Sequence, residues 1–377
     1  MRKATKRLLG KARSLFQKIP PGLRQAIYAT LVGFTVGGVV IAWSGFNPFE
    51  TIKGLLIGGF GSAFYLTTSL TRSVPIIFAG LSAALAWGSG YPSLGASGQM
   101  ILGAMVASQI AVKMPGPPAL VVFFSIIGGM VAGMAYSLIA AWISERFKLY
   151  LLIVTLMMNY IADNIVSYFI HYVIKDPFGL DSSAIQTQKI ENAILPRIFE
   201  KFTIHWGFFI AVGVVIFLWF LLYKTVFGYR SRMGGLNKFF AEYGGINSEK
   251  MMYGVLLLSG ALAGLGGASE VLGVRFRYVD GMISSPGYAW SGVIASFIAS
   301  NHPVGIFFSS IFLAGLTTGG SAVERWLGVP SEVSVIIQTI ITLLITAKFV
   351  IKINLPFKHL KYLPRRLHSH DQGEETQ

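Results

Sequence analysis

Long hydrophobic runs recur along almost the whole chain, and they limit what it can fold into more than any other feature. One run reads VFFSIIGGMVAGMAYSLIAAWI at 122–143, and another reads FFIAVGVVIFLWFLLY at 208–223. Runs of about 20 such residues form helices that cross the roughly 30 Å hydrocarbon layer of a bilayer. The alternating segments of ~10 residues that build membrane barrels do not occur in the sequence. We therefore predict an all-α fold, a polytopic bundle of membrane helices.

The composition supports this prediction. Only 12% of the residues are charged, whereas soluble domains carry about 25%. The mean hydropathy is +0.62. The chain has no cysteine, which excludes disulfides and thiolate metal sites.

The net charge of +15 could suggest nucleic-acid binding, but the placement of the charges argues against it. Eight Lys or Arg residues and no acid lie in 1–24, and six more lie in 348–366, at and after the end of the last hydrophobic run. Short basic flanks mark the cytoplasmic ends of membrane helices, where anionic lipid attracts them. We predict contact with membrane lipid, two cytoplasmic termini and no nucleic-acid partner.

About ten spans are predicted from runs bounded by charge, Pro or Gly. They lie near 25–44, 73–89, 98–113, 118–143, 149–174, 203–223, 251–270, 288–300, 303–320 and 332–350. The weaker, glycine-broken piece 50–70 is either an eleventh span or an interfacial or re-entrant helix. Ten spans place both basic termini and Ser144–Lys148 inside and the charge-balanced loop 175–201 outside, so we predict that 50–70 does not cross.

One polar, basic segment, Tyr229–Lys250, interrupts the hydrophobic runs. Apolar residues spaced i, i+3, i+4 and i+7 fall on one face of a helix. The residues with this spacing are Leu236, Phe239, Phe240 and Tyr243. The glycine pairs 234–235 and 244–245 predict breaks at its two ends.

A helix of about two turns is not stable alone in water, so this one needs a surface. It either rests on lipid headgroups or inserts into a groove of a cytoplasmic partner. Lys238 is the only basic residue among 236–243, whereas lipid-resting helices usually carry several. The residue types therefore favour a partner.

This segment resembles the coupling loop of ATP-binding-cassette (ABC) importer permeases, in their simple-sugar and nucleoside branch. The matching residues are Gly228-Tyr229-Arg230, Arg232, Gly235-Leu236-Asn237, Ala241-Glu242-Tyr243 and Gly245-Ile246-Asn247. The stretches 75–90 and 93–104 also resemble the family's second and third spans with the turn between them, and 256–273 and 302–320 resemble its later spans. The similarity covers roughly 45–350. Ser93 and Ser97 stand where the family usually has Asn and Glu, and Lys238 stands where it usually has proline.

The resemblance implies a permease that forms the translocation pathway of an ATP-driven importer and performs no chemistry. Partners would be ATPase subunits that bind ATP and Mg, a second, often non-identical permease, and an external substrate-binding lipoprotein. The location would be the bacterial cytoplasmic membrane. We expect the chain to divide into a basic segment 1–24, a permease domain 25–350 that includes the coupling loop 224–250, and a tail 351–377. The implied coupling residues are Arg232, Gly235, Leu236, Asn237, Phe239, Phe240, Ala241, Glu242, Tyr243, Gly245 and Asn247. The implied substrate is a nucleoside first, then a simple sugar or a riboflavin-like vitamin.

Polar residues inside a membrane are costly and are candidates for function. Asn159 and Asp163 share a helix face, and they either line the pathway or hold the bundle by hydrogen bonds. The glycine-rich break at 93–99 is expected to line a cavity, because irregular backbone is tolerated at depth only there or inside protein. The candidate pathway residues are Ser93, Ser97, Gln99, Asn159 and Asp163.

Glu270 is expected to form an interfacial ion pair with Arg275 or Arg277. The small-residue motifs Gly129-x-x-x-Gly133 and Gly260-x-x-x-Gly264 are expected to be packing faces. No phosphate-binding loop ending in Lys-Ser/Thr and no metal-ligand pattern occurs in the sequence. A stand-alone transporter or channel is the alternative of another class, although the paired acids or symmetric broken helices that it needs are not found.

Overall fold

The computed structural model describes residues 33, 35–176, 185–199, 201–330, 332, 335, 336, 339 and 340. These residues form helices and no strand, and two isolated bridges, Gln186 with Val279 and Arg197 with His205, join loop segments. The helices are α3 (Pro48–Phe60), α4 (Ala63–Gly88), α5 (Ala96–Lys113), α6 (Pro118–Phe147), α7 (Leu151–Tyr172), α8 (Gly207–Lys224), α9 (Val226–Leu236), α10 (Lys238–Tyr243), α11 (Ser248–Glu270), α12 (Tyr288–Ile298) and α13 (Pro303–Leu327). A π-helical turn, η1 (Val271–Arg275), continues α11.

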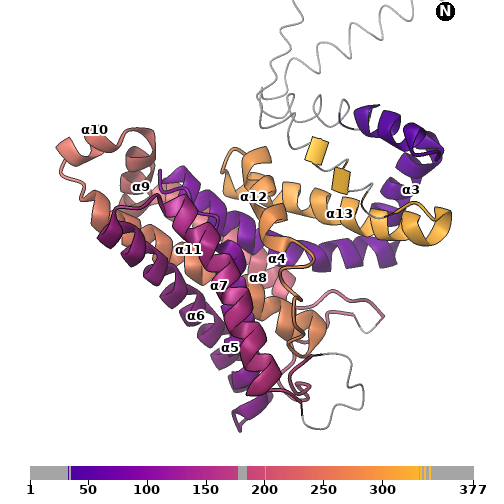
Figure 1. Cartoon of the computed structure of the whole chain (residues 1–377), viewed down its shortest axis with the longest axis horizontal. Helices are drawn as coiled ribbons and strands as arrows, with labels where there is room; N and C mark the ends of the chain where they lie inside the picture. Colours follow the sequence, from indigo (N-terminus) through magenta and orange to yellow (C-terminus); the bar gives the residue numbers. More distant parts are fainter. Residues whose placement is uncertain are drawn as a thin grey trace, which may run out of the picture.

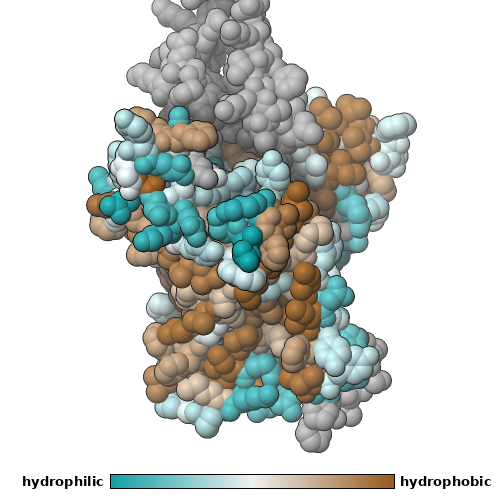
Figure 2. Space-filling view, turned by 60° about the vertical axis from the view of Figure 1, so that its left-hand side comes forward, coloured by the Kyte–Doolittle hydropathy of each residue, from teal (hydrophilic) through white to brown (hydrophobic). Residues whose placement is uncertain are grey.

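Six of the described helices are long and apolar enough to cross a membrane: α4, α6, α7, α8, α11 with η1, and α13. Two further predicted spans, 98–113 and 288–300, are helical as α5 and α12, but they do not reach that length and hydropathy. Of 25–44, residues 33 and 35–43 are helical and 25–32 and 34 lie outside the described residues, as does most of 332–350. On the face seen in Figure 2, hydrophobic side chains form a band across the body, with hydrophilic residues above and below it. The all-helical membrane fold is confirmed, and the count of ten spans is not.

The segment 50–70 is divided between two helices. α3 ends at Phe60, and Ser62 begins α4 by accepting a hydrogen bond from the Tyr65 N–H at 3.3 Å. α4 therefore starts ten residues before the predicted span 73–89 and runs through Pro75 without ending. With 13 residues, α3 is about 20 Å long, which is too short to cross a bilayer.

Helix α11 lies at the centre of the bundle, where α4, α5 and α6 pack against it. Its glycines and those of α6 allow the two backbones to touch. A methyl group on Gly133 would lie 2.2 Å from the Gly260 carbonyl oxygen, and one on Gly264 would lie 2.2 Å from the Gly129 carbonyl oxygen. The two motifs are therefore opposite faces of one contact, as their small residues predicted.

The two ends of the bundle carry different structures. In Figure 1, α9 and α10 lie at one end of the group formed by α5, α6, α7 and α11, beyond the end of α4. The carboxyl end of α5 lies at the other end, against the segment 188–193. On the other side of α4, α3 and α12 pack along α13.

Candidate functional site

Asn237 separates α9 from α10. Its backbone is extended, with φ −157° and ψ 106°, and its Oδ1 accepts a hydrogen bond from the Phe240 N–H at 3.0 Å. The predicted break at Gly234–Gly235 is therefore wrong: both glycines lie within α9, and Leu236 ends α9 instead of belonging to the helix of Phe240. Asparagine is a preferred N-cap because its side-chain oxygen accepts a backbone N–H of the first turn, so α10 begins after Asn237.

The end of α10 is where the glycines predicted it. Gly245 has φ +81°, a left-handed conformation that favours glycine. Asn247 then caps α11 through a hydrogen bond from the Lys250 N–H to its Oδ1 at 2.9 Å. Both asparagines of the resemblance therefore act as helix caps that set the position of α10.

The aromatic side chains of α10 are exposed. Phe239 is 83% exposed, Phe240 62% and Tyr243 95%, and we call these three residues the aromatic knob. Leu236 adds a further exposed side chain, whereas Ala241 is buried and anchors α10. Contiguous exposed apolar side chains mark surfaces for a partner or for lipid.

Arg232 holds α9 to the end of α8. Its guanidinium lies 4.8 Å from the ring centroid of Tyr223, and its Nε donates to the Gly228 carbonyl at 3.4 Å. The Tyr223 ring lies in turn 5.4 Å from that of His302. Arg232 therefore orients the coupling segment and does not belong to the knob.

Glu242 of α10 borders a cavity of about 330 Å³. The lining also includes Glu145, Glu249 and Tyr91. The Tyr91 hydroxyl donates to the Ser248 carbonyl at 2.7 Å, and burial raises the pKa of this phenol.

Asn159 joins α7 to the segment 93–99. Its Oδ1 accepts a hydrogen bond from the Gly98 N–H at 2.8 Å, and its Nδ2 donates to the Leu94 carbonyl at 2.8 Å. Thr155, one turn earlier on α7, accepts a hydrogen bond from the Leu94 N–H at 3.1 Å. Asn159 therefore holds α7 to the segment 93–99 by hydrogen bonds, and it lies next to that segment.

The other candidates differ in position. The predicted break 93–99 is irregular only up to Gly95, because α5 begins at Ala96. Ser93 is buried in the irregular part, whereas the half-buried Ser97 and the buried Gln99 lie in the first turn of α5. The Gln99 Oε1 has no hydrogen-bond partner among the described residues. Asp163 does not join this group. It is half-buried and hydrogen-bonds Ser284, in the segment that precedes α12.

Glu270 is buried and pairs with Arg275 as predicted, with 3.7 Å between Oε1 and Nε. The sequence did not indicate that the Tyr288 hydroxyl also donates to Oε1 at 3.1 Å. Nor did it single out His205, whose ring packs against Gly273 of η1, where a Cβ would lie 2.5 Å from the ring. Burial and the neighbouring Arg197 lower the pKa of His205 to about 4.

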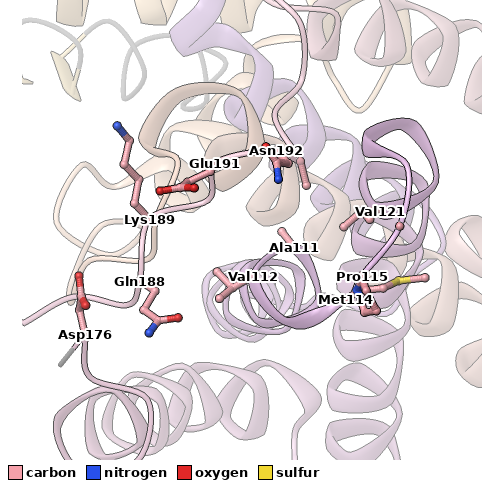
Figure 3. A pocket seen from close by; sticks show the side chains of 12 residues that line it. Ala111, Val112, Met114, Pro115, Val121, Asp176, Gln188, Lys189, Glu191 and Asn192 are labelled. Atoms are coloured by element: carbon pink, nitrogen blue, oxygen red, sulfur yellow. The ribbon is translucent and has the colours of Figure 1, made fainter. Parts of the chain in front are cut away.

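A second cavity, of about 480 Å³, opens at the other end of α5. Figure 3 shows charged and amide side chains on one side of it and the end of α5 on the other. Its polar lining residues are Asp176, Gln188, Lys189, Glu191 and Asn192.

Comparison with known proteins decides the family. Residues 65–346 match the family model described as the branched-chain amino acid transport system permease component. The chain belongs to this permease family. It is a non-catalytic permease subunit of an ABC transporter, as the resemblance implied. Membership sets aside the alternative of a stand-alone transporter or channel.

Three relatives indicate which branch this permease resembles. The guanosine ABC transporter permease NupP of Bacillus subtilis is 28% identical over 86% of this chain and 93% of its own length. The nucleoside ABC transporter permease NupB of Lactococcus lactis is 28% identical over 88% of this chain and 92% of its own. A glucose ABC transporter permease of Haloferax volcanii is 28% identical over 86% and 87%. No solved structure matches this permease significantly, and none of the three names supports the riboflavin-like vitamin.

Proposed function

We propose that this permease forms the translocation pathway of an ATP-driven importer of nucleosides. Permease components of ABC importers work with ATPase and substrate-binding partners. The partners proposed here are two ATPase subunits, a second and non-identical permease, and an extracytoplasmic substrate-binding lipoprotein. ATP and Mg are bound by the ATPase subunits and not by this chain.

The exposed aromatic knob is the observation that carries the coupling role. Three large rings on a helix of six residues offer an anchor for a groove of a partner. Closure of the ATPase subunits on ATP would move the knob, and the bundle would switch between two packings, one open to each side. The coupling residues are the eleven that the resemblance implied, with Asn237 and Asn247 fixing the helix between them.

The proposed orientation follows from charge. The basic segment 1–24, the coupling loop 224–250 and the tail 351–377 face the cytoplasm of a bacterium, and the loop 175–201 faces outward. The permease domain 25–350 would cross the cytoplasmic membrane ten times. The knob and the cavity at Lys189 lie at opposite ends of the bundle, which supports this orientation.

Substrate would pass the break at 93–99. It offers the hydroxyls of Ser93 and Ser97 and the amide of Gln99, and it has no carboxylate. Asn159 shapes this break, and Asp163 lies further along α7. A lining of hydroxyls and amides suits a neutral polar ring compound, because an ion at depth needs an opposite charge.

Nucleosides come first because two of the relatives above are nucleoside or guanosine permeases. A simple sugar is the second candidate, which the glucose permease relative favours. Both are neutral and rich in hydroxyls, so the break at 93–99 does not separate them.

Uptake by the complete transporter tests this function. Cells that express the permease with its ATPases and binding protein would be given labelled guanosine, uridine, glucose or leucine. We expect nucleoside uptake that depends on ATP and is competed by unlabelled nucleoside. Uptake of glucose alone would select the sugar alternative, and uptake of leucine alone would overturn both.

A further inference from the structure

We propose that the segment 88–91, which begins at the last residue of α4 and leads toward α5, is the seat of the aromatic knob and moves with it as one rigid body. The inference rests on the proposed function and identifies Ser89, Ser231 and Gly235 as positioning residues for coupling. Motion of the knob would reach the 93–99 break through this seat.

The first contact is a hydrogen bond between the hydroxyls of Ser89 and Ser231. Both residues are fully buried, although α9 is a largely exposed helix. The Ser89 hydroxyl also donates to the Leu85 carbonyl of α4 at 2.5 Å. α9 is therefore joined to the last turn of α4 in a place from which water is excluded, where hydrogen bonds are stronger.

The second contact is between backbones. A methyl group on Gly235 would lie 2.3 Å from the Gly88 carbonyl oxygen, and one on Gly90 would lie 3.0 Å from the Gly235 Cα. Gly90 has φ +80°, so its conformation also favours glycine. This close approach explains why Gly235 lies inside a helix, where glycine costs about 1 kcal/mol relative to alanine.

The third contact comes from the other side of the knob. The Tyr91 hydroxyl donates to the Ser248 carbonyl at 2.7 Å, in the first turn of α11. α9 and α11 lead into and out of α10, so both flanking helices rest on the same four residues, 88–91. A force on the knob therefore acts on this seat through two connections.

The seat continues into the break. The Trp87 indole N–H donates to the Ser93 carbonyl at 3.0 Å, and only three residues separate Gly90 from Leu94. Leu94 is held in turn by Asn159 and Thr155. Buried and half-buried hydrogen bonds thus connect the coupling segment, the seat and the segment that precedes α5.

A disulfide tests whether the seat and α9 move together. The chain has no cysteine, so Ser89→Cys with Ser231→Cys creates a single pair. The hydroxyls that it replaces are in hydrogen-bond contact, close to the separation that a disulfide requires. The complete transporter would be reconstituted in proteoliposomes, and ATP-driven guanosine uptake would be measured before oxidation, after oxidation and after reduction.

We expect the oxidised pair to import guanosine within about twofold of the reduced pair. Each single cysteine variant, oxidised in the same way, controls for damage by the oxidant. Loss of uptake on oxidation that reduction restores would show that the contact opens in the cycle, and it would overturn the inference. Absence of any ATP-driven uptake by the unmodified transporter would overturn the proposed function, and the inference with it.

Gly235→Ala provides a second test, with Gly244→Ala as its matched control. A methyl group at 244 would have its nearest neighbour at an ordinary 3.4 Å, whereas one at 235 would lie only 2.3 Å from the Gly88 carbonyl oxygen. We expect Gly235→Ala to raise the ATP hydrolysed per guanosine imported at least fivefold, while the ATPases still co-purify. An unchanged ratio in the folded variant would contradict a positioning role.

Discussion

The Asn159 side chain and the Gly98 backbone are joined by a hydrogen bond of 2.8 Å across two helices. The same amide also holds the Leu94 carbonyl at 2.8 Å. One side chain thus satisfies a free N–H in the first turn of α5 and a carbonyl of the irregular segment that precedes it. A membrane protein tolerates irregular backbone at depth only when such partners exist.

Removing this amide should destabilise the permease. Asn159→Leu leaves the Gly98 N–H and the Leu94 carbonyl without their partner, at a cost of about 2 kcal/mol. Asn164→Leu, on an exposed part of the same helix, is the matched control, with an expected change within about 0.5 kcal/mol. Thermal unfolding in detergent measures both variants, and equal unfolding temperatures would contradict the role given to Asn159.

The contact between α6 and α11 should not accept a methyl group. Gly264→Ala places a carbon 2.2 Å from the Gly129 carbonyl oxygen, and we expect a loss of about 3 kcal/mol from overpacking. Gly213→Ala on α8 has no atom within 4 Å of the new carbon and gains helix propensity of up to about 1 kcal/mol. Gly264→Ala should therefore lower both the folded yield and the unfolding temperature, whereas Gly213→Ala should raise or preserve them. Similar values for the two variants would argue against this packing.

Acid should weaken the packing of His205 against η1. Its pKa is about 4 in the folded protein and about 6.5 when unfolded, so the unfolded chain binds the proton more tightly. Stability is then complete above pH ~6.5 and falls as the pH drops, by about 2 kcal/mol at pH 5. Unfolding temperatures between pH 7.5 and 5 measure this loss.

His205→Asn keeps an acceptor for the Gly207 N–H, which His205 Nδ1 accepts at 3.1 Å, and removes the titration. This variant should lose that part of the acid sensitivity, whereas His171→Asn should keep it. The account of His205 would be wrong if both variants followed the wild-type pH dependence.

Single cysteines can establish the orientation, because the chain has none. Glu191 and Lys250 are exposed at opposite ends of the bundle. In intact cells, an impermeant maleimide should label Glu191→Cys and leave Lys250→Cys unlabelled until the membrane is opened. The opposite pattern would reverse the proposed topology.

The sequence predicted the features that depend on local pattern. Hydrophobic runs located the helices, and the spacing of small residues identified both sides of the Gly133–Gly264 contact. It placed the end of α3 and the start of α10 wrongly, because Ser62 and Asn237 act through side-chain caps that resemble ordinary polar residues in a sequence. The contacts of Ser231 with Ser89 and of His205 with Gly273 join distant segments, so no local pattern carries them.

The measurement closest to the central claim is the effect of Phe240→Asp on ATP-driven uptake. A carboxylate buried in an apolar groove without a partner costs several kcal/mol, so the knob should no longer engage the ATPase subunits. Phe240→Leu keeps an apolar side chain and is the control. Uptake is measured in proteoliposomes that contain the complete transporter. We expect Phe240→Asp to reduce guanosine uptake at least tenfold while its unfolding temperature stays that of the wild type. Phe240→Leu should retain most of the uptake. Wild-type uptake and wild-type ATPase binding by Phe240→Asp would contradict the account, because the knob would then rest on lipid.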